Sequence, residues 1–343
     1  MTVPHEPIQL GKLTLPNRVI YSPLAGCSDL PFRQMAAQYK PGLVYCEMVK
    51  LEPLVRGDPT TFHLLDYTAG MHPIGAQLCG SKANLAGQAA RIIEDLGFDI
   101  VDLNCGCPVD KVTKDGSGSG MLKTPQLIGE LISNMVAAVD IPVTVKIRAG
   151  WDEQNINAAE ITKIAEEAGA VAIAIHGRTR AQAYRGPANW DYIKQCREAA
   201  TTIKVFGNGD VFSADAALRM FAYTGCDAIL ASRGTMGAPW IAEDIIKASL
   251  GQEVPVRTIE DYRQALLQHF LYQVAYESGQ KALVSMRRVG CWYIKSSHGT
   301  REFRHKCSRA QSIEEVRQLI LEFPFEAGDV VNAEAAEEES VTA

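Results

Sequence analysis

Short apolar runs recur along the chain at intervals and predict β-strands. Eight segments have the nearly continuous apolar, β-branched composition of strands covered on both faces, and they lie at residues 18–26, 43–49, 73–80, 98–105, 142–150, 170–177, 203–209 and 228–234. Helical periodicity fills most of the gaps, for example at residues 84–96, 125–139, 158–168, 214–223 and 238–249. Because strands that alternate with helices pair in parallel, this order predicts an α/β fold, a (β/α)8 TIM barrel over residues 1–250.

The pattern changes after residue 250. Only helical periodicity follows, at residues 262–278, 282–296 and 313–323, which predicts a small C-terminal helical domain over residues 258–325. The last segment, 326–343, is rich in Ala and Glu and has few large apolar residues, so it is predicted to be disordered. A doubly wound open sheet would also alternate strands with helices, but the G-x-G-x-x-G expected after its first strand is missing.

Composition and cysteine spacing narrow the class of protein. With 343 residues and 47% hydrophobic content the chain can bury a large core. Its apolar runs are all shorter than the roughly 18 residues of a membrane helix, and MTVPHEPIQL lacks the layout of a secretory signal, so we expect a cytoplasmic protein with no membrane partner. Nine mostly isolated cysteines without C-x-x-C pairs predict reduced thiols and no metal site. We expect a monomer, although no pattern specifies the oligomeric state.

The charges behind the net charge of −6 are unevenly distributed along the chain. Residues 326–343 carry six acids and no base, and the rest of the chain has 34 of each. Residues 281–310 carry eight Lys or Arg against one acid, Glu302. This basic segment is compatible with a nucleic-acid partner, whereas a merely solvated helix face is the simpler alternative for its arginines.

Polar residues gather where the predicted strands end. In a TIM barrel these ends form the active-site face. The set comprises Ala25-Gly26, Glu47, Gln77, residues 104–108 (NCGCP), Lys146 with Arg148, residues 176–178 (HGR), residues 208–210 (NGD) and residues 232–234 (SRG). The last two clusters follow strands seven and eight, where such barrels commonly bind phosphate, although either cluster alone could simply permit a tight turn.

Three residues of this set have chemistry of their own. Lys146 and His176 end neighbouring apolar strands, and a lysine in a barrel mouth calls for an anion or an electron-rich ring as its companion. Cys107 lies between a glycine and a proline on a stiff turn. An ordinary thiol is mostly protonated at neutral pH and can still release its proton, which suits a general acid. Most cysteines are inert, and that alternative is stronger for Cys105.

Together these motifs resemble a known family. The runs SPLAGCSDLPFR, CEMV, AQLCG, DLNCGCPVDKV, VKIRAGW, IHGRTR, FGNGD and SRG are similar to those of the bacterial tRNA-dihydrouridine synthases over nearly all of residues 10–310. The resemblance implies an FMN-bearing (β/α)8 barrel, a helical tRNA-binding domain, and NADPH as the reductant. It also implies that the enzyme reduces specific uridines of tRNA to 5,6-dihydrouridine.

The resemblance assigns roles to single positions. Cys107 resembles the proton donor, and Asn104 the residue that contacts uracil. The flavin contacts would be Leu24, Ala25, Gly26, Gln77, Lys146 and His176 around the ring, with Asn208, Gly209, Asp210, Ser232, Arg233 and Gly234 along the ribityl phosphate. Other substrate contacts would be Arg178, Tyr184, Arg287 and Arg288.

Two departures and two rival functions accompany this interpretation. The family often has glycine at the position of Ser232, and residues 115–120 (DGSGSG) carry extra glycines that would make a more mobile loop. One rival is a flavin barrel that acts on a small-molecule pyrimidine, which would not need the basic C-terminal domain. The other is a non-catalytic tRNA-binding protein, which the Lys146, His176 and Cys107 set disfavours.

Overall fold

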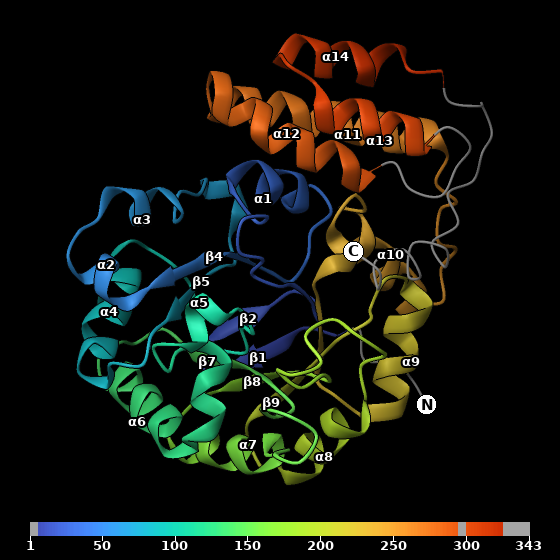
Figure 1. Ribbon diagram of the computed structural model, residues 1–343. Coiled ribbons are helices and arrows are strands. Elements are labelled where there is room, and N and C mark those ends of the chain that lie inside the picture. The colour runs from blue at the N-terminus through green and yellow to red at the C-terminus, as the bar shows by residue number, and fades with distance from the viewer. Residues whose placement is uncertain (1–5, 294–299, 325–343) are drawn as a thin grey trace.

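The structure, a computed structural model, describes residues 6–293 and 300–324. Its centre is a closed barrel of eight parallel strands in the order β10-β3-β4-β5-β6-β7-β8-β9, surrounded by helices (Figure 1). The predicted TIM barrel is confirmed. The barrel strands are β3 (Val19–Tyr21), β4 (Leu43–Lys50), β5 (Ile74–Cys79), β6 (Ile100–Cys105), β7 (Val143–Arg148), β8 (Ala172–His176), β9 (Lys204–Asn208) and β10 (Ala228–Ala231).

Helices alternate with these strands and cover the outside of the barrel. They are α1 (Leu30–Ala37), α2 (Leu51–Val55), α3 (Pro59–His63), α4 (Ala83–Asp95), α5 (Asp110–Thr113), α6 (Pro125–Val136), α7 (Ala158–Glu167), α8 (Asp191–Ala199), α9 (Ala214–Thr224) and α10 (Ile241–Ser249). Short 3-10 turns lie at η1 (Ala69–Met71), η2 (Gly118–Lys123) and η3 (Arg233–Thr235). Local sequence sets the ends of α9, where the Ser213 side chain accepts a hydrogen bond from the Ala216 N–H and Gly225 takes the left-handed conformation that stops the helix.

A short hairpin closes the end of the barrel opposite the strand carboxyl ends. Strands β1 (Ile8–Leu10) and β2 (Leu13–Leu15) pair antiparallel. Their buried leucines, Leu10 and Leu15, join Ile20, Tyr45 and Phe206 in the core that fills the barrel interior. The hydrophobic pattern did not predict this hairpin because each strand is only three residues long.

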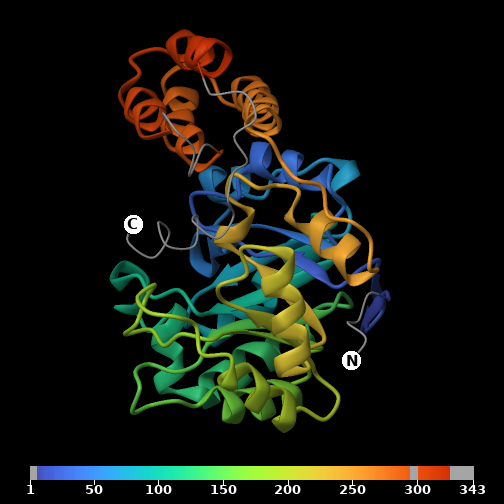
Figure 2. The same ribbon diagram turned by 90° about the vertical axis from the view of Figure 1, so that its right-hand side faces the viewer.

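Four further helices form a bundle at one end of the molecule (Figures 1 and 2). They are α11 (Ile259–Tyr276), α12 (Gly279–Tyr293), α13 (Thr300–Arg309) and α14 (Ile313–Glu322). A capping box between Thr258 and Asp261 begins α11, close to the residue where the sequence pattern changes. The predicted disordered tail, 326–343, lies outside the described residues.

The bundle rests on the barrel through α1 and α3. Helix α11 packs against α1. Tyr276 of α11 stacks on His63 of α3, with ring centroids 4.9 Å apart, and donates a hydrogen bond to Asp66. His63 also lies 3.0 Å from the Glu277 carboxylate. These contacts hold the basic bundle next to the loop that follows β3.

Candidate active site

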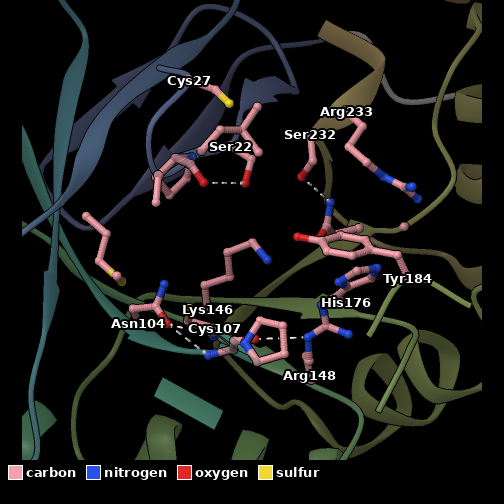
Figure 3. A pocket seen from close by; sticks show the side chains of 18 of the residues that line it. Ser22, Cys27, Asn104, Cys107, Lys146, Arg148, His176, Tyr184, Ser232 and Arg233 are labelled. Carbon is pink, nitrogen blue, oxygen red and sulfur yellow. Dashed lines mark hydrogen bonds between the residues drawn. The ribbon is translucent and has the colours of Figure 1, made fainter. Parts of the chain in front are cut away.

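A pocket of about 350 Å³ opens at the carboxyl ends of the barrel strands. Each of the eight strands, or the loop that follows it, supplies part of its lining. The sequence predicts thirteen catalytic and cofactor-binding residues. Twelve of them line this pocket, together with the predicted substrate contacts Asn104 and Tyr184. The lining includes Leu24, Ala25, Gln77, Asn104, Cys107, Lys146, His176, Tyr184, Asn208, Gly209, Asp210, Ser232, Arg233 and Gly234. Figure 3 shows Cys107 with Asn104 and Lys146 on one side, and Ser22 and Cys27 across the pocket.

Cys107 faces the pocket on a loop whose backbone is firmly held. The N–H groups of Gly106 and Cys107 donate to Asn104 Oδ1 at 3.1 and 2.9 Å. The carbonyl of Cys107 accepts from the N–H and the hydroxyl of Ser119, at 3.0 and 2.9 Å. Cys107 is half-buried, whereas Cys105 is fully buried and burial raises the pKa of its thiol well above the usual range. The two cysteines are therefore in different environments, and of these two Cys107 alone lines the pocket.

One glycine of the 115–120 loop, Gly118, packs against this cysteine. Gly118 has a φ of +57°, and a Cβ there would lie 2.9 Å from the Cys107 carbonyl oxygen. A Cβ on Gly120 would lie 3.1 Å from the carbonyl of Thr113. Ser117 and Ser119 are buried as well. Gly118 therefore has a role in close packing beside Cys107, and the greater mobility expected of this loop from its sequence stays a prediction.

Buried positive charge surrounds the centre of the pocket. Burial, and then the charge of Arg148, lowers the pKa of Lys146 to about 8. Within the described part of the chain the Lys146 ammonium has no hydrogen-bond or ion-pair partner. Burial, together with Arg148 and Lys146, holds the pKa of His176 well below its usual range, so its imidazole is neutral at physiological pH. Such a site favours an anionic or electron-rich ligand next to Lys146.

Arg148 belongs to the site, although its motif was noted without a role from sequence. Its Nε donates to the Gly106 carbonyl at 2.9 Å, and its Nη1 donates to the carbonyls of Thr179 and Ala183 at 2.9 and 2.7 Å. One guanidinium thus joins the loop of Cys107 to the loop of Tyr184, whose ring centroid lies 5.6 Å away. The signal was present in the sequence, because Lys146 and Arg148 are two residues apart in a strand and share a face.

The far end of the pocket is an arginine cluster built on Asp210. Arg178 is fully buried and forms a bidentate pair with the Asp210 carboxylate, at 2.7 and 2.8 Å. Arg233 lies 3.4 Å from the same carboxylate and 4.9 Å from the Tyr184 ring centroid. Arg178 does not line the pocket, so its observed place is a support for Asp210 and Arg233. Two guanidinium groups against one carboxylate leave this end positively charged.

Backbone and small side chains complete the same end. Gly209 and Asp210 both have positive φ, at +121° and +56°, in the turn after β9. Asn208 Nδ2 donates to the Leu230 carbonyl and to Ser232 Oγ, at 2.7 and 2.9 Å. Ser232 is therefore tied to the neighbouring strand end, and its hydroxyl is occupied with Asn208.

The segment after β3 forms a tight turn at the pocket rim. The Leu24 carbonyl accepts from the N–H groups of Cys27 and Ser28, at 2.8 and 2.9 Å. Gly26 has a φ of +73° and donates its N–H to the Glu47 carboxylate. Leu24 and Ala25 line the pocket, whereas Gly26 lies just outside the lining.

The two arginines predicted to bind substrate lie on α12 and differ in their surroundings. Arg288 is exposed and reaches back to the barrel, so that its Nη1 would lie 3.5 Å from a Cβ on Gly26. Arg287 donates to the Ala310 carbonyl at 2.8 Å and so helps to hold the bundle together. Only Arg288 stands at the junction between the bundle and the pocket rim.

Residues 6–293 and 300–324 hold neither a membrane-spanning helix nor a metal-binding cluster. None of the helices there is long and apolar enough to cross a membrane. In the same residues, no three His, Cys, Asp or Glu side chains form a group that could hold a metal ion.

Comparison with known proteins decides the family. The family model of dihydrouridine synthase (Dus) matches residues 20–327. The chain belongs to the dihydrouridine synthase family. It is 37% identical to tRNA-dihydrouridine synthase B of Pseudomonas syringae pv. tomato, over 92% of this chain and 94% of that protein. It is 36% identical to the probable tRNA-dihydrouridine synthase 1 of Synechocystis, over 93% of this chain and 90% of that protein.

Solved structures add a likeness in fold. The structure of TcOYE with pHBA superposes with a TM-score of 0.56 at 15% identity, covering 76% of this chain and 96% of that one. Histamine dehydrogenase from Rhizobium sp. 4-9 gives a TM-score of 0.55 at 15% identity, covering 79% of this chain and 51% of that one. At this level of identity the likeness concerns the barrel fold of this dihydrouridine synthase family member.

Proposed function

We propose that this protein is an FMN-dependent tRNA-dihydrouridine synthase that acts in the cytoplasm, with Cys107 as the proton donor. Family membership supports the reaction class, since the relatives that match over nearly their whole length carry this name. The observation that carries the proposal is the pairing of a pocket-facing thiol, Cys107, with a half-buried lysine, Lys146, inside one pocket.

The residues present fit FMN. Lys146 is a half-buried cation without a partner in the described chain, which suits the electron-rich end of a flavin ring, and Gln77 lines the same pocket. At the other end, Arg233 and the backbone turns at Gly209 and Gly234 offer the positive charge and close approach that a phosphate needs. Bound FMN would supply the hydride, with NADPH as its reductant.

The side chains of this chain would hold the pyrimidine and deliver the proton. Asn104 Oδ1 is committed to two backbone N–H groups, so its Nδ2 is the atom able to donate to a uracil carbonyl. The Cys107 thiol, held by the same loop, would then donate its proton to C5 of the ring. The exposed ring of Tyr184, backed by the guanidinium groups of Arg148 and Arg233, offers a surface on which a base can stack.

The helical bundle would bind the tRNA and help to withdraw the uridine from its stack. Extracting a stacked base costs a few kcal/mol, and cations along the backbone offset that cost by binding phosphates. Arg288 has a suitable place, because it is exposed and lies beside the rim of the pocket.

The proposal is tested by measuring whether the purified protein, in the oligomeric state in which it is isolated, forms dihydrouridine in tRNA. Protein loaded with FMN and supplied with NADPH should raise the mass of unmodified tRNA by about 2 Da per reduced uridine. Mapping dihydrouridine in tRNA from cells that lack the protein should show the same positions missing. Reduction of free pyrimidines in preference to tRNA, or a tRNA that is bound but never changes mass, would contradict the proposal.

A further inference from the structure

A carboxyl group lies buried beneath the pocket and is not part of its lining. Asp102 on β6 is 4% exposed and faces the barrel interior between Gln77 of β5 and Thr144 of β7, its partners in the strand register. The hydroxyl of Thr144 donates to Asp102 Oδ1 at 2.6 Å, and Gln77 Nε2 donates to Oδ2 at 2.8 Å. Burying a carboxyl group costs free energy even when it is hydrogen-bonded. A functional role would explain why the barrel core keeps one.

A chain of hydrogen bonds runs from this carboxyl group to the loop of Cys107. Asn104 Nδ2 donates to Gln77 Oε1 at 2.8 Å, while Gln77 itself donates to Asp102. At its upper end, Asn104 Oδ1 accepts from the N–H groups of Gly106 and Cys107. Two side chains thus join a buried acid to the backbone on which Cys107 is carried.

The direction of each hydrogen bond in this row, from Asp102 to the Cys107 backbone, is fixed by the groups at its two ends. An ionised carboxylate only accepts hydrogen bonds, and a backbone N–H only donates them. With an acceptor at the lower end and donors at the upper end, the amides of Gln77 and Asn104 are each fixed in one orientation. Both residues line the pocket, so each can turn only its remaining N–H toward a ligand.

We propose that Asp102 is a positioning residue for uracil reduction: its carboxylate anchors Gln77 and Asn104, and through them the backbone of Cys107, so that the pocket floor presents amide donors. The inference rests on the proposed function. Asp102 does not line the pocket and acts through the two amides. A small cavity between the pocket and the barrel core is lined by both Asp102 and Lys146, so the carboxylate also places a negative charge near that lysine.

The chain can be tested by removing its lower anchor in two steps. Asp102→Asn keeps the shape and one acceptor but replaces a charge-assisted hydrogen bond by a neutral one, which is roughly half as strong. Asp102→Leu removes the acceptor and leaves Gln77 Nε2 without its partner. Tyr45→Phe is the matched control, because the Tyr45 hydroxyl lies 3.3 Å from Thr144 Oγ1 and has no hydrogen bond to Gln77 or Asn104 in the described residues.

The first measurement is single-turnover formation of dihydrouridine across a range of tRNA concentrations, using full-length protein loaded with FMN and reduced by dithionite. The maximal rate should fall about 30-fold in Asp102→Leu and about 5-fold in Asp102→Asn, and stay within about twofold in Tyr45→Phe. The tRNA concentration that gives half the maximal rate should change by less than about twofold in all three, because the chain positions reacting groups and does not bind the tRNA backbone.

The second measurement needs neither flavin nor activity. Amide hydrogen exchange at Gly106 and Cys107 in the flavin-free protein should quicken about tenfold in Asp102→Leu and stay unchanged in Tyr45→Phe. Unchanged exchange in both Asp102 variants, or a maximal rate in Asp102→Asn within twofold of the wild type, would overturn the proposal. If Asp102→Leu does not fold, Asp102→Asn alone decides. A wild-type protein that forms no dihydrouridine contradicts the proposed function instead, and the exchange data still report on the chain.

Discussion

The polar groups of the pocket and those of the helical bundle differ in how far they are buried and in how many hydrogen bonds they make. In the pocket, Asn104 and Arg148 are buried and Asp210 is half-buried, and each uses several hydrogen bonds to fix neighbouring atoms. In the bundle, Arg288 and Lys306 are largely exposed cations on helices α12 and α13. Under the proposed function, chemistry in the pocket depends on fixed geometry, whereas tRNA binding by the bundle depends on charge that many residues share. Substitutions should therefore cause steep losses in the pocket and graded ones in the bundle.

Removing the thiol should cause the largest loss. Cys107→Ala is expected to lower dihydrouridine formation at least about 100-fold, because a general acid commonly contributes that much, while FMN and tRNA still bind. Cys291→Ala, which removes another half-buried thiol in the bundle, is the control and should stay close to the wild type. Mass analysis of the tRNA product reports both. Equal turnover in the two variants would show that Cys107 is not the proton donor.

Arg148→Lys should cause the second largest loss of dihydrouridine formation. A lysine keeps the positive charge but has a single nitrogen, which cannot reach the carbonyls of Gly106, Thr179 and Ala183 together. We expect about a 30-fold lower rate at saturating tRNA, with little change in tRNA affinity. If the rate were retained, charge alone would explain Arg148, and the two loops would not need a shared support.

The pH dependence of the pocket should be bell-shaped. Burial raises the pKa of Asp102 to about 6, so its acceptor form is lost as the pH falls through that value. The pKa of Lys146 is lowered to about 8, so its cation is lost as the pH rises through that value. The single-turnover rate should therefore fall on the acid side by about 5-fold, the loss expected for Asp102→Asn, and then level off, and it should fall on the alkaline side by at most about tenfold per pH unit. Asp102→Asn should lack the acid limb, and an unchanged acid limb would assign it to another group.

Arg288→Ala tests the bundle. Because the guanidinium is exposed, its loss should weaken tRNA binding only about 3- to 10-fold at moderate salt and lower the salt slope by about one. FMN affinity and the rate at saturating tRNA should not change. Arg317→Ala, on α14, is the control, since Arg317 is paired with Glu314 away from the pocket rim. Equal weakening by both would mean that the whole bundle surface, and not its junction with the barrel, attracts tRNA.

The smallest effect is expected at Ser232. Ser232→Gly restores the residue that the family often has at this position and removes the hydroxyl that accepts from Asn208. FMN binding, followed by fluorescence titration, should weaken by only about two- to threefold, because the backbone remains available to a phosphate. A loss as large as that of a pocket arginine would show that the hydroxyl itself binds the ligand.

Sequence predicts the barrel well because its strands are buried on both faces and read as continuous apolar runs. The elements it leaves out are short or polar, such as β1, β2 and the charged helix α13. Polar residues at strand ends lead to the pocket, but sequence does not show which of them satisfy one another. Arg178 and Asp210 were both predicted as ligand contacts, and the structure pairs them. Asp102 was overlooked, although its spacing from Asn104 places both on one face of β6.

The central claim is that this pocket reduces uracil within tRNA. Rapid mixing of the reduced, FMN-loaded protein with unmodified tRNA, and separately with uridine monophosphate, tests it most directly when flavin absorbance and product mass are followed together. The account predicts that tRNA reoxidises the flavin much faster than the nucleotide does, with one uridine gaining about 2 Da for each flavin oxidised. Faster oxidation by the free nucleotide, or flavin oxidation without a matching gain in tRNA mass, would contradict it.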